Sequence, residues 1–142
     1  MPKALGALLK RVFPILAVML LLAGCDAKFD DASQSYSAII GTQFQIRGEL
    51  YIFGLPIERG NNKDVRSYVI HPPPGIAGRD LISKARVPVG TKFEIIKVQK
   101  CSNCFPFPSY NKYVLRFSNG MYSDAPVYFT DEVFSEKGRL WL

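Results

Sequence analysis

One stretch constrains the fold more than any other: apolar and polar side chains alternate over residues 42–53. The apolar residues that share one parity are Phe44, Ile46, Leu50 and Ile52. Because successive side chains of a β-strand point to opposite faces, this period predicts a strand with one buried face. Gly48 falls on the apolar parity, where the missing side chain predicts a bulge or a sharp bend in a curved strand.

Other segments rich in β-branched and aromatic residues lie between turns made of Gly, Pro and Asn. These segments predict further strands at residues 65–71, 92–100 and 112–117. The parity of the apolar residues slips where Ile95 is followed by Ile96, which predicts either a β-bulge or a strand buried on both faces. Residues 78–86 are compatible with a strand or with a single helical turn.

The last part of the chain adds a turn and a short helix. Asn119-Gly120 predicts a tight hairpin that pairs the strand before it with a strand within residues 121–129, because both central positions of such a turn favour positive φ. Residues 130–132 begin a helical turn, and residues 138–142 dock or pair as a last apolar segment. Five or six short strands without a helical period predict an all-β domain, a small antiparallel barrel or sandwich of SH3-like or OB-like outline. Such an outline names no function.

The first 25 residues have a separate character. A basic start with Lys3, Lys10 and Arg11 precedes an uncharged apolar run that ends in Leu22-Ala23-Gly24-Cys25. This pattern resembles the signal peptide and lipobox of bacterial lipoproteins. The resemblance implies cleavage before Cys25, a diacylglycerol on its thiol and a place in the cell envelope. Residues 1–24 are then the signal peptide, and the lipid on Cys25 attaches the mature chain to the membrane.

Two alternatives for the apolar run are a short buried helix and an uncleaved transmembrane anchor. The uncharged run over residues 12–25 is shorter than the about 18–20 residues that a membrane-spanning helix needs, and Pro14 lies near its start. Both features favour the signal peptide. Asp26 follows the cysteine, and an aspartate at this place resembles the inner-membrane retention signal of enterobacterial lipoproteins. The expected location is therefore the inner membrane, facing the periplasm, with the outer membrane as the alternative.

The residues after Cys25 are polar and small and show no apolar period. We therefore expect residues 25–40 to form a flexible tether and residues 41–142 to form one small β domain. Cleavage removes three of the 18 basic residues, which leaves 15 against 12 acidic ones and lowers the net charge from +6 to +3. A nearly neutral domain gives no support for nucleic-acid binding. Its basic residues form either a solvated strand face or a patch toward anionic lipid headgroups. They include Lys92, Lys97, Lys100, Lys112 and Arg116.

The segment Cys101-Ser102-Asn103-Cys104 is the part of the mature chain with the most specific chemistry. A haem-attachment site would need His at the next position, which is Phe, and a zinc site would need more ligands than His71, the single histidine. A thioredoxin-like redox centre would begin a helix in a βαβ unit, which nothing here predicts. The remaining interpretation is a structural disulfide between Cys101 and Cys104, as an oxidising envelope allows. No metal and no other cofactor is expected.

Four aromatic residues follow the first of these cysteines closely: Phe105, Phe107, Tyr110 and Tyr113. Prolines at positions 106 and 108 restrict the same loop, and pre-organised aromatic side chains are typical of binding hot spots. We expect this loop, together with the Asn119-Gly120 hairpin, to contact a partner protein of the envelope. The alternative is that the rings cap one end of the barrel and stabilise its core.

Common enzyme motifs are missing from the sequence, which has no Gly-rich phosphate loop, no Gly-x-Ser-x-Gly and no His-Glu-x-x-His. A pair of catalytic carboxylates would not be visible in sequence spacing. The available carboxylates include Glu94, Asp124, Asp131 and Glu132. The sequence thus favours a non-catalytic, membrane-anchored binding or scaffold module, with a small redox or hydrolytic envelope enzyme as the alternative.

Overall fold

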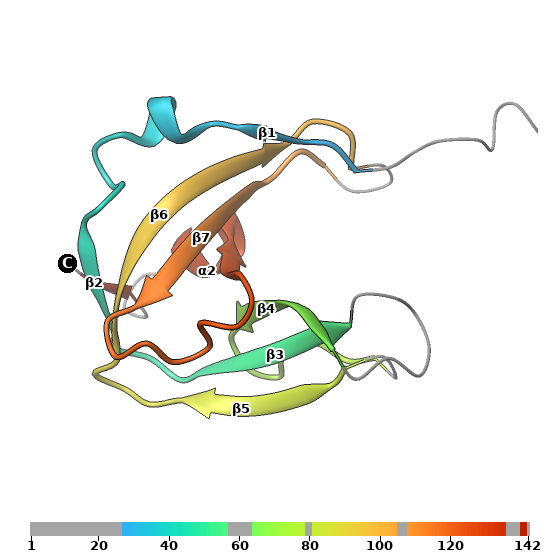
Figure 1. Cartoon of the computed structure of the whole chain (residues 1–142), viewed down its shortest axis with the longest axis vertical. Helices are drawn as coiled ribbons and strands as arrows, with labels where there is room; N and C mark the ends of the chain where they lie inside the picture. Colours follow the sequence, from blue (N-terminus) through green and yellow to red (C-terminus); the bar gives the residue numbers. More distant parts are fainter. Residues whose placement is uncertain (1–26, 57–63, 79–80, 105–107, 136–139, 142) are drawn as a thin grey trace, which may run out of the picture.

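The computed structural model describes residues 27–56, 64–78, 81–104, 108–135 and 140–141. Within these ranges the chain forms nine strands, one 3₁₀ turn and one short α-helix (Figure 1). In chain order they are β1 (Phe29–Asp31), η1 (Ser33–Tyr36), β2 (Gln43–Ile46), β3 (Leu50–Pro56), β4 (Val65–His71), β5 (Ser83–Val87), β6 (Lys92–Cys101), β7 (Asn111–Phe117), β8 (Val127–Thr130), α2 (Asp131–Ser135) and β9 (Leu140–Trp141). The all-β prediction is confirmed.

The strands form one sheet in the order β5-β3-β4-β8-β7-β6-β2-β9, with β1 beside β6. β4 and β8 run parallel, whereas the other neighbours are antiparallel. The sheet curls, so that β3, β4 and β5 lie below β6 and β7 in Figure 1 and both groups of strands contribute to one core. The sheet is therefore mixed and is not closed into an antiparallel barrel, which was one of the two predicted outlines beside the sandwich. β8 returns antiparallel beside β7 and lies between β7 and β4, where it runs parallel to β4.

The strand predicted over residues 42–53 is bent, as Gly48 indicated. It divides into β2 and β3 at residues 47–49, and the opposite pair, β5 and β6, is interrupted at residues 88–91. The two bends are joined by hydrogen bonds: the Ile46 N–H donates to the Thr91 oxygen at 2.9 Å, and the Gly90 N–H donates to the Ile46 oxygen at 2.7 Å. The segments over residues 43–56 and 83–101 thus bend at the same place. This shared bend lets the sheet fold over its own core.

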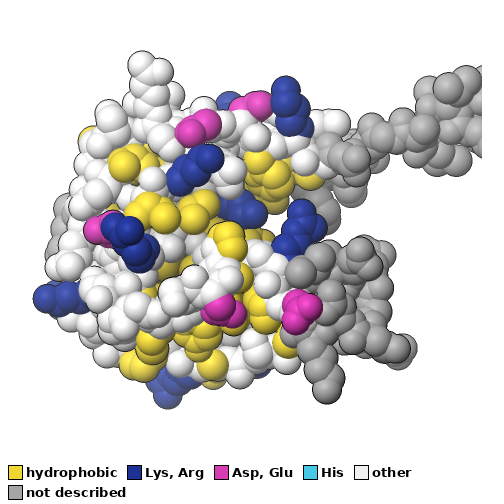
Figure 2. Space-filling view, viewed as in Figure 1, with side chains coloured by type: hydrophobic (Ala, Val, Ile, Leu, Met, Phe, Trp, Pro, Cys, Tyr) yellow, Lys and Arg dark blue, Asp and Glu magenta, His cyan; other side chains and the backbone are white. Residues whose placement is uncertain are grey.

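A β-bulge interrupts β6 at the place where the apolar parity slips. The register of β6 against β7 shifts between Ile95 and Lys97, so Ile96 has no partner residue on β7. Ile95 is buried in the core, whereas 42% of Ile96 is exposed. The bulge was one of the two predicted outcomes, and it places an apolar side chain on the outer side of the sheet. Figure 2 shows hydrophobic side chains across the middle of this face.

The predicted antiparallel pairing of β7 with the strand that follows it is confirmed, since β8 pairs with β7, but the tight turn predicted at Asn119-Gly120 is wrong, because β8 begins only at Val127. Gly120 has a positive φ of 74°, but Asn119 does not share this conformation, which a two-residue turn of the expected type requires. Instead the Asn119 side chain accepts a hydrogen bond of 3.1 Å from the Met121 N–H. Tyr122 also has a positive φ, 54°. Residues 118–126 therefore form a long loop, called loop 118–126 below.

Residues 29–36 belong to the folded domain, which corrects the flexible tether expected over residues 25–40. β1 pairs antiparallel with the end of β6, and Phe29 lies opposite Cys101. η1 follows, and its Tyr36 packs edge-on against Tyr113 at 5.9 Å. The domain thus begins by Phe29 rather than at residue 41, because backbone pairing with β6 orders a segment that has no apolar period of its own.

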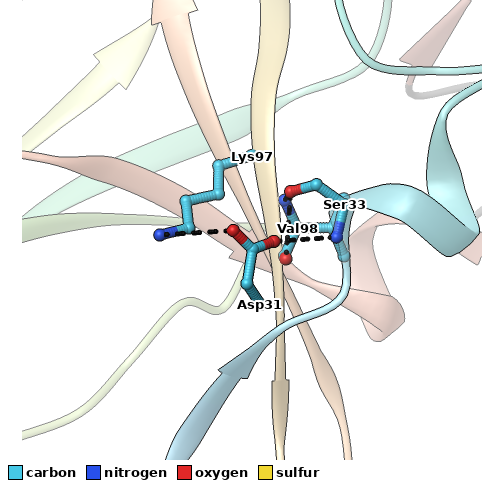
Figure 3. A network of polar contacts seen from close by, with 4 residues as sticks. All are labelled: Asp31, Ser33, Lys97 and Val98. Atoms are coloured by element: carbon cyan, nitrogen blue, oxygen red, sulfur yellow. Dashed lines mark hydrogen bonds and ion pairs between the residues drawn. The ribbon is translucent and has the colours of Figure 1, made fainter.

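Polar contacts hold this segment on β6 (Figure 3). Asp31 Oδ1 accepts a hydrogen bond of 2.9 Å from the Ser33 N–H, and Asp31 Oδ2 lies 3.8 Å from Lys97 Nζ. Ser33 Oγ in turn accepts a hydrogen bond of 3.1 Å from the Val98 N–H. The hydrogen bonds from Ser33 lower the pKa of the Asp31 carboxyl, because they stabilise its charged form.

The core is formed by aromatic and aliphatic side chains from both parts of the curled sheet. Tyr113 stacks on Phe129 with ring centres 5.3 Å apart. α2 covers one side of the core: Val133 is fully buried, and Phe134 stacks on Tyr113 at 4.8 Å. No helix among the described residues has the length and apolar character to span a membrane.

Candidate binding groove

A groove with a volume of about 660 Å³ lies between loop 118–126 and the strands β6 and β7. Ile96 and Val114 contribute apolar side chains from the strands, and Met121 and Pro126 contribute them from the loop. We call this site the β6–β7 groove. The groove includes Gly120 of the predicted hairpin, which was expected to contact a partner protein. The contribution of β6 and β7 to the groove was not predicted.

Two local features shape the groove. The β-bulge turns Ile96 out of the core. Loop 118–126 is anchored to β4, because the Tyr68 hydroxyl donates a hydrogen bond of 3.0 Å to Asp124 and the Tyr122 ring packs edge-on against Tyr68 at 4.8 Å. Burial, followed by the hydrogen bond to Asp124, raises the pKa of Tyr68, so the hydroxyl remains a donor at neutral pH. Loop 118–126 is thus fixed against β4 and forms one wall of the groove.

The groove combines apolar side chains with a charged border. Its apolar residues lie next to an ion pair between Arg116 and Glu94, which also lines it. Apolar surface with a polar border is typical of protein-binding surfaces. In the part of the chain that the structure describes, no three His, Cys, Asp or Glu side chains lie close enough together to hold a metal ion.

The two cysteines lie at disulfide distance, with Cα atoms 5.9 Å apart. They close the start of the connection between β6 and β7. The Cys101 N–H donates to the Tyr110 oxygen at 2.9 Å, and the Ser102 N–H donates to the Lys28 oxygen at 3.0 Å. The hydrogen bond from Ser102, which lies between the two cysteines, joins this connection to the chain that leads into β1. Cys101 is 0% exposed and Cys104 is 9% exposed.

The aromatic residues proposed as a contact surface have different surroundings. Phe105 and Phe107 lie outside the described residues. Tyr110 is half-buried beside Phe29, with ring centres 6.2 Å apart, and burial raises its pKa. Tyr113 is 3% exposed and belongs to the core. The prediction that Tyr113 contacts a partner is wrong, because the alternation of β7 turns Tyr113 inward; it stabilises the core, as the alternative interpretation held.

The four carboxylates considered for a catalytic pair have separate partners. Arg116 pairs with Glu94, the Tyr68 hydroxyl donates to Asp124, and His71 lies 3.5 Å from Glu132. Asp131 takes part in the network described next. Each of these carboxylates is thus engaged in its own contact.

Asp131, the first residue of α2, accepts three hydrogen bonds from β7. The Asn111 N–H donates to Oδ2 at 2.6 Å, the Asn111 side chain donates to Oδ1 at 3.1 Å, and the Tyr113 hydroxyl donates to Oδ1 at 2.9 Å. The Asn111 side chain also donates to the Tyr36 hydroxyl at 2.9 Å. Burial, followed by the hydrogen bond to Asp131, raises the pKa of Tyr113. Asp131 thus joins α2 to β7, and Asn111 extends the network to η1.

We expect Asp131→Ala to lower the free energy of unfolding by about 2–3 kcal/mol, because it leaves partly buried donors without an acceptor. Urea denaturation followed by circular dichroism measures the change. Asp124→Ala is the matched control: it removes one hydrogen bond, from Tyr68, and should cost about 1 kcal/mol. Equal losses in the two variants would contradict a central role for Asp131.

Comparison with known proteins identifies no relative: no family model matches the chain, and no match is found among curated proteins or solved structures. The one sequence signal for the groove was the slip at Ile95 and Ile96, which predicts an apolar residue on the outer side of a strand.

Proposed function

We propose that the chain is a lipid-anchored module of the bacterial cell envelope that binds a partner protein and catalyses no reaction. The observation that carries the proposal is the β6–β7 groove, an apolar surface beside a charged pair, held open by an anchored loop. The lipobox that ends at Cys25 supports the anchor, and Asp26 supports the periplasmic side of the inner membrane over the outer membrane.

The distance between lipid and domain is short in this proposal. β1 begins at Phe29, four residues after Cys25. Four extended residues reach at most about 14 Å, so the domain would lie against the membrane surface rather than far from it. The partner is then expected to be a membrane protein or a protein held at the same surface.

Thiol–disulfide exchange is the less favoured function. An exchanging disulfide must offer one sulfur to an attacking thiolate, whereas Cys101 is 0% exposed and Cys104 is 9% exposed. We therefore propose that this disulfide is structural and holds the β6–β7 connection beside the chain that leads into β1.

The test places a photo-reactive amino acid at position 96 of the full chain, in native membranes. Illumination should give an adduct of defined mass with one partner, because Ile96 lies in the groove and is exposed. Position 89 is the matched control: Val89 is also apolar and is 58% exposed, but it lies in the turn between β5 and β6. A second change, Val114→Glu, should remove the adduct formed from position 96. The same adducts from both positions, or adducts from position 89 alone, would argue against the groove as the binding site.

A further inference from the structure

The ammonium group of Lys112 lies over two aromatic rings on the outer side of β7. Its Nζ is 3.8 Å from the centre of the Tyr128 ring and 4.9 Å from the centre of the Phe29 ring. Ring faces attract a cation and position it, but they do not neutralise its charge. In the described part of the chain, no carboxylate forms an ion pair with Lys112.

A second cation, Arg66, lies on β4, the strand that pairs with β8 at Tyr128. Arg66 is the extra residue where the register between β3 and β4 shifts, and such bulges change the direction of a side chain. Burial, followed by the positive charge of Arg66, holds the pKa of Lys112 below its ordinary value. The two like charges therefore repel each other, and no ion pair to Arg66 is found among the described residues. A site of this kind favours an anion that touches both groups.

The site lies where the chain enters the domain. Phe29, which forms one wall around the ammonium group of Lys112, is the first residue of β1 and the fourth after Cys25. Figure 2 shows several Lys and Arg side chains toward the end of this face where β1 begins in Figure 1. If Cys25 carries lipid, this end of the domain is the one nearest the headgroups.

We propose that Lys112 and Arg66 together bind the phosphate group of an anionic membrane lipid. The inference rests on the proposed lipid anchor for the position of the membrane. Two cations that have no acidic partner among the described residues complement the charge of a phosphate, and a negatively charged leaflet attracts basic groups held near it. The Tyr128 and Phe29 rings suit the same place, because aromatic side chains are favoured at the boundary between headgroups and acyl chains. The single negative charge of a lipid phosphodiester placed between the two cations offsets their mutual repulsion.

The test uses the full chain in micelles of a nonionic detergent, with the backbone amide signals of Lys112 and Tyr128 followed by NMR. Dihexanoyl phosphatidylglycerol is added in one titration, dihexanoyl phosphatidylcholine in a second, and inorganic phosphate in a third. We expect saturable shifts with phosphatidylglycerol alone. Detergent keeps the chain in solution whether or not Cys25 carries lipid, so failure of this binding and failure of the lipid anchor are separate results.

Two variants show whether the named side chains bind the lipid. Lys112→Gln and Arg66→Gln should each weaken phosphatidylglycerol binding about fivefold or more, the change expected when one cation is lost near an anionic surface. Lys92→Gln is the control, because Lys92 lies at the opposite end of β6 from Cys101. Arg66 is exposed, so Arg66→Gln should keep the spectrum of a folded chain even where Lys112→Gln does not.

Three results would overturn the proposal. An equal response to phosphatidylcholine would show that the anionic charge is not recognised. Saturation by inorganic phosphate at the same concentration would show that the site takes free phosphate rather than lipid. Unchanged affinity in both variants would place the binding elsewhere on the domain.

Discussion

Replacing Cys25 with serine is expected to abolish lipid attachment and cleavage of the leader. Wild-type protein from native membranes should yield an N-terminal peptide that begins at Cys25 and carries acyl mass, whereas Cys25→Ser protein should keep residues 1–24 and carry no acyl mass. In the bacterial lipoproteins that residues 1–25 resemble, the lipid is attached through the thiol sulfur of the cysteine, which serine lacks. Each buried methylene contributes about 0.8 kcal/mol to membrane affinity, so the loss of the acyl chains removes the main anchor of the mature chain. Mass spectrometry measures both changes.

The control for this experiment is the double variant Cys101→Ser and Cys104→Ser. It removes the other two cysteines but leaves the lipobox intact, so the acyl mass on Cys25 should remain. A wild-type chain that begins at Met1 and carries an unmodified thiol at Cys25 would show that the apolar run is an uncleaved anchor, and the lipoprotein proposal would be abandoned.

The second large effect is expected at Gly75, in the turn that follows β4. Gly75 has a φ of +87°, and a methyl group there would lie 2.5 Å from Cζ of Phe53, whose side chain is 0% exposed. A side chain in the left-handed region costs about 1–2 kcal/mol, and an overlap with a closely packed ring costs about 1–3 kcal/mol. We therefore expect Gly75→Ala to lower the free energy of unfolding by about 2–5 kcal/mol, measured by chemical denaturation.

Substitutions at two other glycines separate the cost of the backbone conformation from the cost of the overlap with the Phe53 ring. Gly78 has no atom within 4 Å of the added methyl group and no positive φ, so Gly78→Ala should cost nothing measurable. Gly41 also has no atom within 4 Å, but its φ is +77°, so Gly41→Ala measures the backbone contribution alone, about 1–2 kcal/mol. If Gly75→Ala is no worse than Gly41→Ala, the Phe53 ring does not pack against this turn.

The strands with a regular apolar pattern were predictable because their pattern is local. The predicted strand over residues 65–71 coincides with β4, and the bend at Gly48 and the bulge beside Ile96 both lie where the alternation is broken. In each case the two-residue period of the strand is enough to predict on which face of the sheet a side chain lies. The close pair Cys101 and Cys104 is local in the same sense, since three positions separate the two residues.

β1 was not predictable, because it depends on a partner far along the chain. Its residues are mostly polar and form no pattern, and they are ordered by backbone pairing with the end of β6. The same holds for loop 118–126. Asn119-Gly120 favours a tight turn, but the contacts of Tyr122 and Asp124 with Tyr68 of β4 hold a longer path. Tertiary contacts overrode the local preference in both segments.

The candidate sites likewise have features that the sequence predicted and features that only the tertiary structure shows. The amino-acid sequence by itself determined the all-β class and the places where the strand alternation breaks, at Gly48 and beside Ile96, and its resemblance to a lipobox supports the proposed anchor. The tertiary structure alone decided that Tyr113 is a core residue, that loop 118–126 forms a groove with β6 and β7, and that Lys112 meets Phe29. The physical reason is that apolar periodicity depends on near neighbours along one strand, whereas a groove or a cation site needs side chains from strands whose pairing is set by the packing of the whole sheet.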